Sequence, residues 1–460
     1  MPSSWKPSVE LCSASQPTSF AYESTVKRWP TILTGVIDGL SKLNGHLLEP
    51  QDEGKLKESK VLINNIAGLI YEMRHDRELP DIDASAGLPD DAKVYNNVLA
   101  TARAEGKPIK WFNASWLYAE CYMQVQYRRL RAMFSSTEHW RSFDCFASQK
   151  LGAFRSSASG IYALARSVQD LVKKGQPSEQ ELHADFIKML EICLWGNATD
   201  LSLLTSLTHE DIQALQSVER GADFVLKNDF AKVWQHVKTL DKKRIDIVLD
   251  NSGFELYSDL VLGDWLLTLS PFCSEVVFHP KLIPCQPHDF KILLSSLLDP
   301  AFFPSDSGAS DEDHQALKAM VERWQSYVDK GVFRLSTPLD LEMGAPGGEI
   351  ADFWTGPQAF ADLLSEAPEL LKELKKASLV IFKGDLNYRK LTYDACWPTT
   401  TSFEDTLGPL KGEFDILSLR TCKADVCVGL EEGKAEELDR TDPSWRVSGK
   451  YAVVSFVPRC

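Results

Sequence analysis

The spacing of hydrophobic positions divides the chain into two parts. Up to about residue 240, apolar residues recur at the three- and four-residue spacing of amphipathic helices. Residues 178–195 are the clearest case, because Ser178 and Glu181 form the S-x-x-E pattern of a capping box ahead of an apolar stripe. A second long, aromatic-rich helix is predicted over 111–134. We therefore expect a mainly helical N-terminal domain over residues 1–240.

After residue 240, short apolar runs alternate with helical stretches. A helix predicted between the first two runs has the length that a crossover between parallel strands needs. Near-continuous apolar strands joined by helices are typical of a parallel sheet covered on both faces. The predicted fold class is therefore α/β, with a Rossmann-like α/β/α core and a mostly parallel sheet over residues 241–460. The candidate strands are 245–249, 275–279, 332–336, 379–383, 416–420 and 451–456.

Composition and charge narrow the class of protein. Hydrophobic residues make up 44% and charged residues 25% of the 460 residues, as in ordinary globular proteins. The net charge of −15 disfavours binding to nucleic acid, although it leaves room for a small phosphorylated ligand. None of the ten cysteines forms a C-x-x-C pair, and reduced thiols are expected. With no secretory h-region and no long apolar run, we expect a cytoplasmic protein without a membrane partner, with the nucleus as a second location.

The first predicted strand of the second half ends in polar residues that suit a metal. Asp250 and Asn251 supply hard oxygen donors beyond the carboxyl end of that strand, where open parallel sheets bind ligands. Ser252 and Gly253 open the next helix, whose free amides favour an anion. The alternative is a plain helix N-cap, for which Asp, Asn and Ser are the usual residues. These four residues alone favour both interpretations equally.

The second predicted strand is followed by another carboxylate. Asp289 is a candidate second metal-binding acid at the same edge of the sheet, or else the N-cap of the helix that begins there. His279 and His288 lie nearby. We expect both histidines to be structural and do not assign them as metal ligands.

Two later strand ends carry cations together with hydroxyl and amide groups. Arg and Lys side chains there suit an anionic, hydroxyl-rich ligand such as a sugar phosphate. With the carboxylates above, they form the set of groups used in metal-assisted phosphoryl chemistry. The candidate substrate-binding residues after these strands are Lys383, Gly384, Asp385, Asn387, Tyr388, Arg389, Arg420 and Lys423.

At these residues the sequence resembles the damage-control metal phosphatases, in particular their acidic-residue methyltransferase-like subfamily with an Arg-Thr-x-Lys signature. The resemblance spans nearly the whole chain, and its longest motifs, DNSGFE and KGDLNYRK, are the most specific. The matching stretches are 20–33, 116–130, 195–204, 250–267, 278–289, 383–394 and 420–430.

The resemblance implies a role for individual residues. Asp250, Asn251 and Asp289 would be the catalytic metal ligands, and Glu255 a nearby site residue. Lys423 would neutralise phosphate, and the residues that would face the substrate with it are Asp385, Asn387, Tyr388 and Arg389. The sequence departs from the family pattern before Asp289, where it reads Cys285-Gln286-Pro287-His288. Ser252 replaces a small apolar residue.

The predicted function is metal-dependent hydrolysis of sugar phosphates of the fructose 1-phosphate or fructose 6-phosphate type, in metabolite damage control. The resemblance implies Mn²⁺, Co²⁺ or Ni²⁺ as the metal, and the oxygen donors also suit Mg²⁺. Either water or Asp250 would attack phosphorus. One alternative is an S-adenosylmethionine-dependent protein carboxyl O-methyltransferase, although the turn after the first strand has a single Gly where that cofactor normally needs several. Another is a sugar-phosphate sensor without turnover.

Overall fold

The computed structural model describes most of the chain. The described residues are 5–47, 49, 52–83, 91–133, 138–141, 143–196, 223–282, 287–299, 301–303, 309–339, 341 and 348–459. The stretch 195–204 carries part of the family resemblance, and its residues 197–204 lie outside the described residues. No helix among the described residues combines the length and apolarity needed to cross a membrane.

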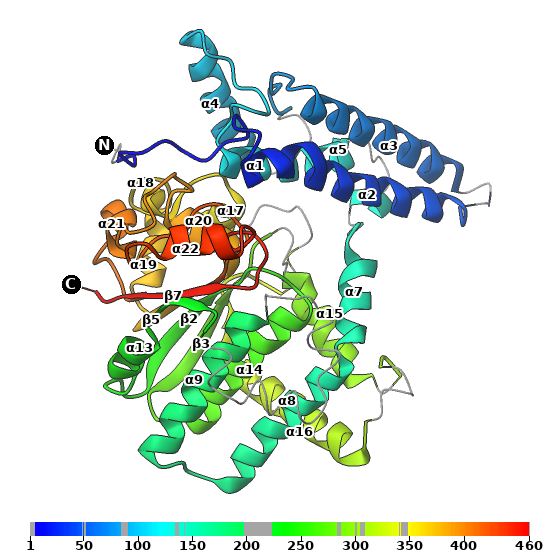
Figure 1. Ribbon diagram of the computed structural model, residues 1–460. Coiled ribbons are helices and arrows are strands. Elements are labelled where there is room, and N and C mark those ends of the chain that lie inside the picture. The colour runs from blue at the N-terminus through cyan, green and yellow to red at the C-terminus, as the bar shows by residue number, and fades with distance from the viewer. Residues whose placement is uncertain are drawn as a thin grey trace.

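The N-terminal helices form a unit with its own apolar core, at the top of the molecule in Figure 1. Its interior is rich in aromatic side chains, and Trp111 and Tyr122 are fully buried there. The predicted helix over 111–134 is α5, which begins later, at Trp116. The helices are α1 (Phe20–Glu23), a π-helical turn (Ser24–Arg28), α2 (Trp29–Asn44), α3 (Glu53–Arg74), α4 (Asp91–Ala104), α5 (Trp116–Met133) and α6 (Glu138–Arg141).

The second unit is built on one seven-stranded sheet with the order β1-β7-β6-β5-β2-β3-β4. Neighbouring strands are parallel except for β6 and β7, which are antiparallel. The strands are β1 (Val225–Asn228), β2 (Lys243–Val248), β3 (Cys273–His279), β4 (Phe333–Leu335), β5 (Leu379–Lys383), β6 (Ile416–Thr421) and β7 (Ala452–Val457).

Helices cover both faces of this sheet, as Figure 1 shows. One face packs against α8 (Ala158–Lys174), α9 (Glu179–Trp195), α13 (Phe230–Val237), α14 (Phe254–Leu269), α15 (Pro287–Leu298) and α16 (Asp311–Asp329). The other packs against α17 (Glu349–Thr355), α18 (Leu363–Glu366), α19 (Pro368–Leu374), α20 (Gly384–Leu391), α21 (Phe403–Thr406), α22 (Lys434–Thr441) and 3₁₀ turns at Phe360–Asp362 and Gly408–Leu410. The predicted α/β/α core with a mostly parallel sheet is confirmed.

The part of the chain before residue 241 contributes to both units. Helix α7 (Ala147–Ser156) leads from the N-terminal helices into the sheet core, where α8 and α9 pack and where β1 joins an edge of the sheet. The predicted capping box of α9 is present, with Ser178 and Glu181 as its two members. The division at residue 240 stays a prediction, and from this packing we propose a boundary near residue 143.

Strand order places the polar strand ends side by side. Because β6, β5, β2 and β3 are consecutive and parallel, their carboxyl ends lie at one edge of the sheet. The candidate residues follow these four strands. The sheet therefore positions the candidate site below the N-terminal helices (Figure 1).

Candidate metal and phosphate site

Asp250 and Asn251 follow β2 directly, in the turn that leads into α14. Helix α14 begins at Phe254, and its N-cap is Gly253, whose φ of 71° favours glycine. The N-cap alternative for the preceding polar residues is therefore wrong. Gly253 has no side chain with which to cap this helix, and the amides of a helix N-terminus favour an anion.

The side chains of this turn form a cluster of oxygen donors. The Asn251 amide donates to Asp250 Oδ2 at 3.1 Å and to Glu255 Oε2 at 3.0 Å. Lys281, which follows β3, donates from Nζ to Asp250 Oδ1 at 2.6 Å. Glu255 Oε1 is buried and has no hydrogen-bond partner among the described residues. The cluster therefore contains an acceptor that the described part of the chain leaves unsatisfied.

The electrostatics of the cluster favour an additional cation. Asp250 is 6% exposed and Glu255 is 4% exposed. Burial, and after it the charge of Asp250, raises the pKa of the Glu255 carboxyl to about 7. Two neighbouring buried carboxylates and an amide oxygen are hard donors of the kind that divalent cations prefer. The residues present thus fit a bound divalent cation.

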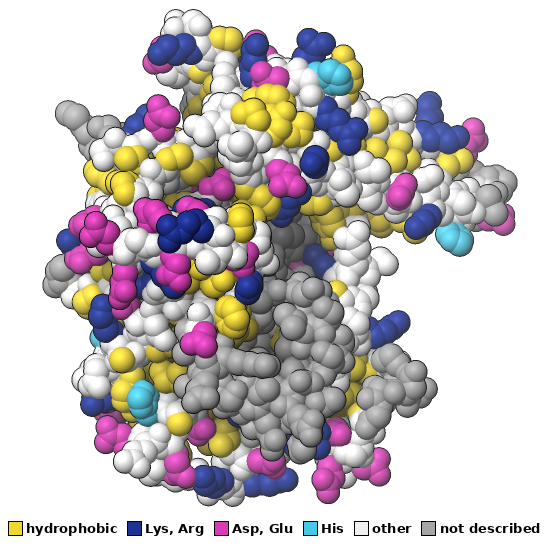
Figure 2. Space-filling view, in the orientation of Figure 1, with side chains coloured by type: hydrophobic (Ala, Val, Ile, Leu, Met, Phe, Trp, Pro, Cys, Tyr) yellow, Lys and Arg dark blue, Asp and Glu magenta, His cyan; other side chains and the backbone are white. Residues whose placement is uncertain are grey.

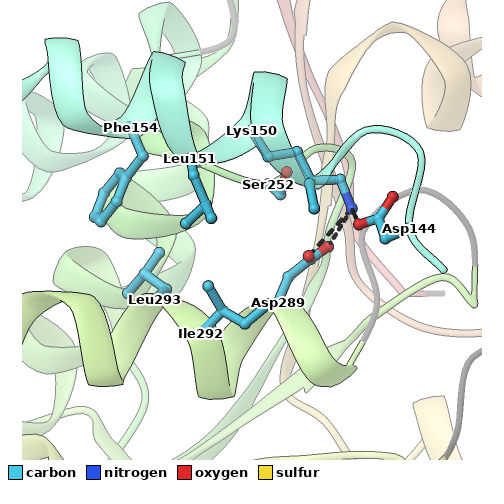
Figure 3. Close-up of a pocket in the computed structure, with 10 residues that line it drawn as sticks. Asp144, Lys150, Leu151, Phe154, Ser252, Asp289, Ile292 and Leu293 are labelled. Atoms are coloured by element: carbon cyan, nitrogen blue, oxygen red, sulfur yellow. Dashed lines mark hydrogen bonds and ion pairs between the residues drawn. The ribbon is translucent and has the colours of Figure 1, made fainter. Parts of the chain in front are cut away.

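Asp289 lies on the other side of the same turn. It is in the first turn of α15, two residues after that helix begins at Pro287, so it is not the N-cap. Its carboxylate receives two hydrogen bonds from Lys150 Nζ, at 3.1 and 3.0 Å, and Lys150 also bonds Asp144 at 2.9 Å. Figure 3 shows Lys150 reaching from α7 between the two acids.

This arrangement borders a shallow pocket that is open to solvent. Ser252 and Gly253 line it together with Asp289, while Leu151 and Phe154 supply an apolar wall (Figure 3). Among the described residues, no three His, Cys, Asp or Glu side chains gather as a metal site. Asp250, Glu255 and Asp289 therefore do not form one cluster here, and the role of Asp289 as a ligand stays a prediction.

The first residues after β5 are held by the protein interior. Lys383 is fully buried and donates to Asp259 Oδ1 on α14 and to the carbonyl of Cys193 on α9, both at 2.7 Å. Gly384 has a φ of 82°, which lets α20 begin immediately after the strand. Asn387 donates its amide to the carbonyls of Leu249 and Lys383, at 3.1 and 2.8 Å. These contacts fix the junction between β2 and β5.

The remaining residues of α20 and β6 form an ion-pair network. Arg389 bonds Asp394 at 2.8 and 3.1 Å, pairs with Glu120 on α5 and stacks on Trp116. In the same network, Arg420 donates to Asp385 at 2.8 Å and lies over the Tyr388 ring.

Two groups complete this end of the sheet. The backbone amide of Lys423 donates to Asp385 at 3.1 Å, and the Lys423 side chain is partly exposed. The Tyr388 hydroxyl accepts a hydrogen bond from the Val428 amide. The substrate-binding roles predicted for these residues stay predictions.

Three residues of this region were not predicted as site residues. Lys281 lies two positions after β3 and carries a sequence signal, because it follows His279 at a strand end. Lys150 comes from α7 and Glu120 from α5, far from the strand ends in the sequence, and neither carries such a signal. The expectation that His279 is structural is confirmed, since it is buried and bonds Asp246 at 3.0 Å.

Comparison with known proteins identifies the family. The family model described as "Damage-control phosphatase ARMT1-like domain" matches residues 24–438. "Damage-control phosphatase ARMT1" from Xenopus tropicalis is 34% identical over 95% of this chain and 96% of its own length. The protein of that name from Bos taurus is 35% identical over 95% and 96%, and the one from Homo sapiens is 32% identical over the same shares.

A crystal structure of a DUF89 family protein from Pyrococcus horikoshii gives a TM-score of 0.34 at 18% identity, over 73% of this chain and 84% of that chain. That likeness is too distant to support an argument. The family model and the relatives confirm the resemblance found in the sequence, and the chain belongs to the damage-control phosphatase ARMT1-like domain family.

Proposed function

We propose that this phosphatase hydrolyses sugar phosphates of the fructose 1-phosphate or fructose 6-phosphate type, as a step of metabolite damage control. Membership of a damage-control phosphatase family gives the hydrolase class. The substrate class is our inference from the groups around the strand ends, which offer cations for phosphate and polar groups for hydroxyls. We further propose the cytoplasm, with the nucleus as a second location, as the place where it acts. The eight described cysteines, all unbridged, support a reducing compartment.

The observation that carries the proposal is the oxygen cluster after β2. Asn251 donates hydrogen bonds to both Asp250 and Glu255, and Glu255 Oε1 has no partner among the described residues. Buried acceptor atoms normally receive a hydrogen bond. A buried carboxylate oxygen without one therefore marks a place for a ligand. The uncapped first turn of α14 adds amides for an anion beside it.

We propose that Asp250, Asn251 and Asp289 hold a divalent cation, which is Mn²⁺, Co²⁺, Ni²⁺ or Mg²⁺. A cation there supplies charge for a phosphoryl oxygen and lowers the pKa of a coordinated water. Glu255 would keep the Asn251 amide oriented through its 3.0 Å hydrogen bond. Lys281 would fix the rotamer of Asp250 through its 2.6 Å contact.

The phosphate and the sugar would be bound by other parts of the chain. The amides that open α14 and the partly exposed Lys423 side chain would receive phosphate oxygens. Asp385 lies between Arg420 and Lys423, where its remaining oxygen can accept from a sugar hydroxyl. On the face seen in Figure 2, acidic and basic side chains of the described residues intermix, which suits a small ligand better than nucleic acid.

The test is phosphate release from fructose 1-phosphate and fructose 6-phosphate by wild type and Asp250→Asn, each with Mn²⁺, Co²⁺, Ni²⁺ or Mg²⁺ after chelation. We expect activity only with metal, and a loss of about 100-fold or more in the variant. Asp170→Asn, on the exposed side of α8, is the matched control. Full activity of Asp250→Asn, or turnover after chelation, would contradict the proposal. Stoichiometric S-adenosylmethionine binding would favour the methyltransferase instead, and ligand-induced stabilisation without turnover would favour a sensor.

A further inference from the structure

Two cysteines far apart in the sequence face each other where the N-terminal segment meets the chain after α20. Leu11 and Ala395 form an antiparallel bridge. The Cys12 amide donates to the Asp394 carbonyl, and the Cys396 amide donates to the Glu10 carbonyl, both at 2.8 Å. This pairing fixes the register and places Cys12 and Cys396 diagonally on the same side of the pair. Their sulfur atoms are 3.6 Å apart.

The pair has the accessibility that redox chemistry requires. Cys396 is exposed, whereas Cys12 is 6% exposed and sits behind it. The hydrogen bond from Cys12 lowers the pKa of the Cys396 thiol, and the same contact raises the pKa of Cys12. An accessible thiol in contact with a second, buried thiol is the usual arrangement of an attacking and a resolving cysteine.

We propose that Cys12 and Cys396 are a reversible oxidation site, at which a hydroperoxide converts the two thiols into an intramolecular disulfide. The Cys396 thiolate attacks one peroxide oxygen, the O–O bond breaks, and hydroxide leaves and is protonated to water. The Cys12 thiol then attacks the sulfur of the Cys396 sulfenic acid, losing its proton as a second water departs. Two thiols lose two protons and two electrons, and with them one hydrogen peroxide becomes two waters.

The disulfide would tie the two structural units together. The Cys12 carbonyl accepts a hydrogen bond from the Trp116 amide, at the start of α5, at 2.7 Å. Ser13 and Ser115 form an antiparallel β-bridge beside it. On the Cys396 side, Arg389 donates a hydrogen bond to Asp394 and stacks on Trp116. A link between positions 384 residues apart closes a very long loop, and such links restrict the unfolded chain most. The oxidised form should therefore be more stable than the reduced form.

The experiment compares reduced protein with protein treated with a small excess of hydrogen peroxide, after free thiols are blocked with N-ethylmaleimide. Peptide mass mapping should find the Cys12 and Cys396 peptides joined, with the loss of two hydrogens. The oxidised protein should unfold at a temperature about 5 °C higher, and dithiothreitol should reverse the shift.

Variants separate the proposal from general oxidation. Cys396→Ser and, independently, Cys12→Ala should remove both the linked peptide and the shift, while Cys145→Ser, a half-buried cysteine elsewhere, should keep both. Accumulation of Cys396 sulfinic acid with Cys12 still open to alkylation, or disulfides between chains, would overturn the proposed pair. A linked peptide without a rise in unfolding temperature would overturn its stabilising role.

Discussion

Two neighbouring pairs of strand ends, at the same edge of the sheet, carry similar polar residues but use them differently. We call them the β2–β3 end and the β5–β6 end. The β2–β3 end consists of Asp250, Asn251, Glu255 and Lys281, and it leaves Glu255 Oε1 without a partner among the described residues. The β5–β6 end consists of Asp385, Asn387, Tyr388, Arg389 and Arg420, and each of these side chains bonds other protein groups, although Arg420 Nη1 also has no partner among the described residues.

The difference teaches that a polar strand end is not by itself a binding site. At the β5–β6 end each acid of the network bonds an arginine, so the network contributes to the fold, whereas the unpartnered atom at the β2–β3 end is a carboxylate oxygen, which favours a bound cation. Substitutions at the two ends should therefore affect different measurements. At the β2–β3 end they should lower activity more than stability, and at the β5–β6 end they should lower stability first.

The largest effect is expected for Arg389→Met. Arg389 is 3% exposed and joins Asp394 and Glu120, so its loss leaves two acids without their cation. Breaking a buried pair of this kind costs about 3–5 kcal/mol, which urea unfolding would measure. Arg103→Met is the matched control, because Arg103 also pairs with two acids, Glu78 and Asp81, but near the surface. A loss below about 1 kcal/mol is expected there, and equal losses at both positions would remove the distinction.

The second-largest effect is expected for Glu255→Gln at the β2–β3 end. We expect phosphate release to fall by about 100-fold, because the amide cannot replace a carboxylate beside a cation. The free energy of unfolding of the metal-free protein should stay equal or rise by about 1 kcal/mol, since a buried acceptor next to Asp250 is removed. Glu322→Gln, on an exposed position of α16, should change neither quantity. A destabilised variant with full activity would place Glu255 with the structural network instead.

The sequence predicted the sheet well because its strands are short, continuous apolar runs. Six of the seven strands start and end within two residues of their predicted bounds. The exception is β1, whose residues Val225–Asn228 read VLKN, too short and too polar to stand out from its surroundings. It forms an edge of the sheet, where one side lacks a neighbour and apolar patterning is weakest.

The sequence predicted that the candidate residues would lie at one edge of the sheet, but not which of their side chains would bond each other. Strand ends in a parallel sheet meet at one edge, so the set of residues around Asp250 followed from sequence. Which of them bind each other depends on side-chain direction. The side chains of Lys383 and Phe382 point to opposite faces of the sheet. Lys383 points toward α14, where it donates to Asp259, and away from the face on which Tyr388 packs. Lys150 and Glu120 come from helices more than 100 residues earlier, which no local pattern connects to the sheet.

A third prediction concerns Lys390, a cation of α20 that has no carboxylate as a hydrogen-bond partner among the described residues. Lys390 is fully buried and donates to the carbonyls of Phe353 and Trp354, at 3.3 and 3.0 Å. Burial lowers the pKa of Lys390 to about 8, so between pH 8 and pH 10.5 the unfolded chain binds more protons than the folded one. The contribution of Lys390 to the free energy of unfolding should therefore rise with pH, by about 2 kcal/mol from pH 8 to pH 10. Lys390→Met should lack that rise, and identical pH profiles in urea unfolding would contradict the assignment.

The smallest effect is expected for Lys423→Met, which tests whether the β5–β6 end also serves a substrate. Its backbone amide is anchored on Asp385, while its side chain is partly exposed and so remains accessible to phosphate. Loss of one cation near the phosphate should raise KM about 10-fold, equivalent to about 1.4 kcal/mol, with kcat less affected. The free energy of unfolding should change by less than about 0.5 kcal/mol, and Lys434→Met on α22 should leave both quantities unchanged. An unchanged KM with lowered stability would make the whole β5–β6 end structural, and the phosphate would then depend on the α14 amides and the β2–β3 end alone.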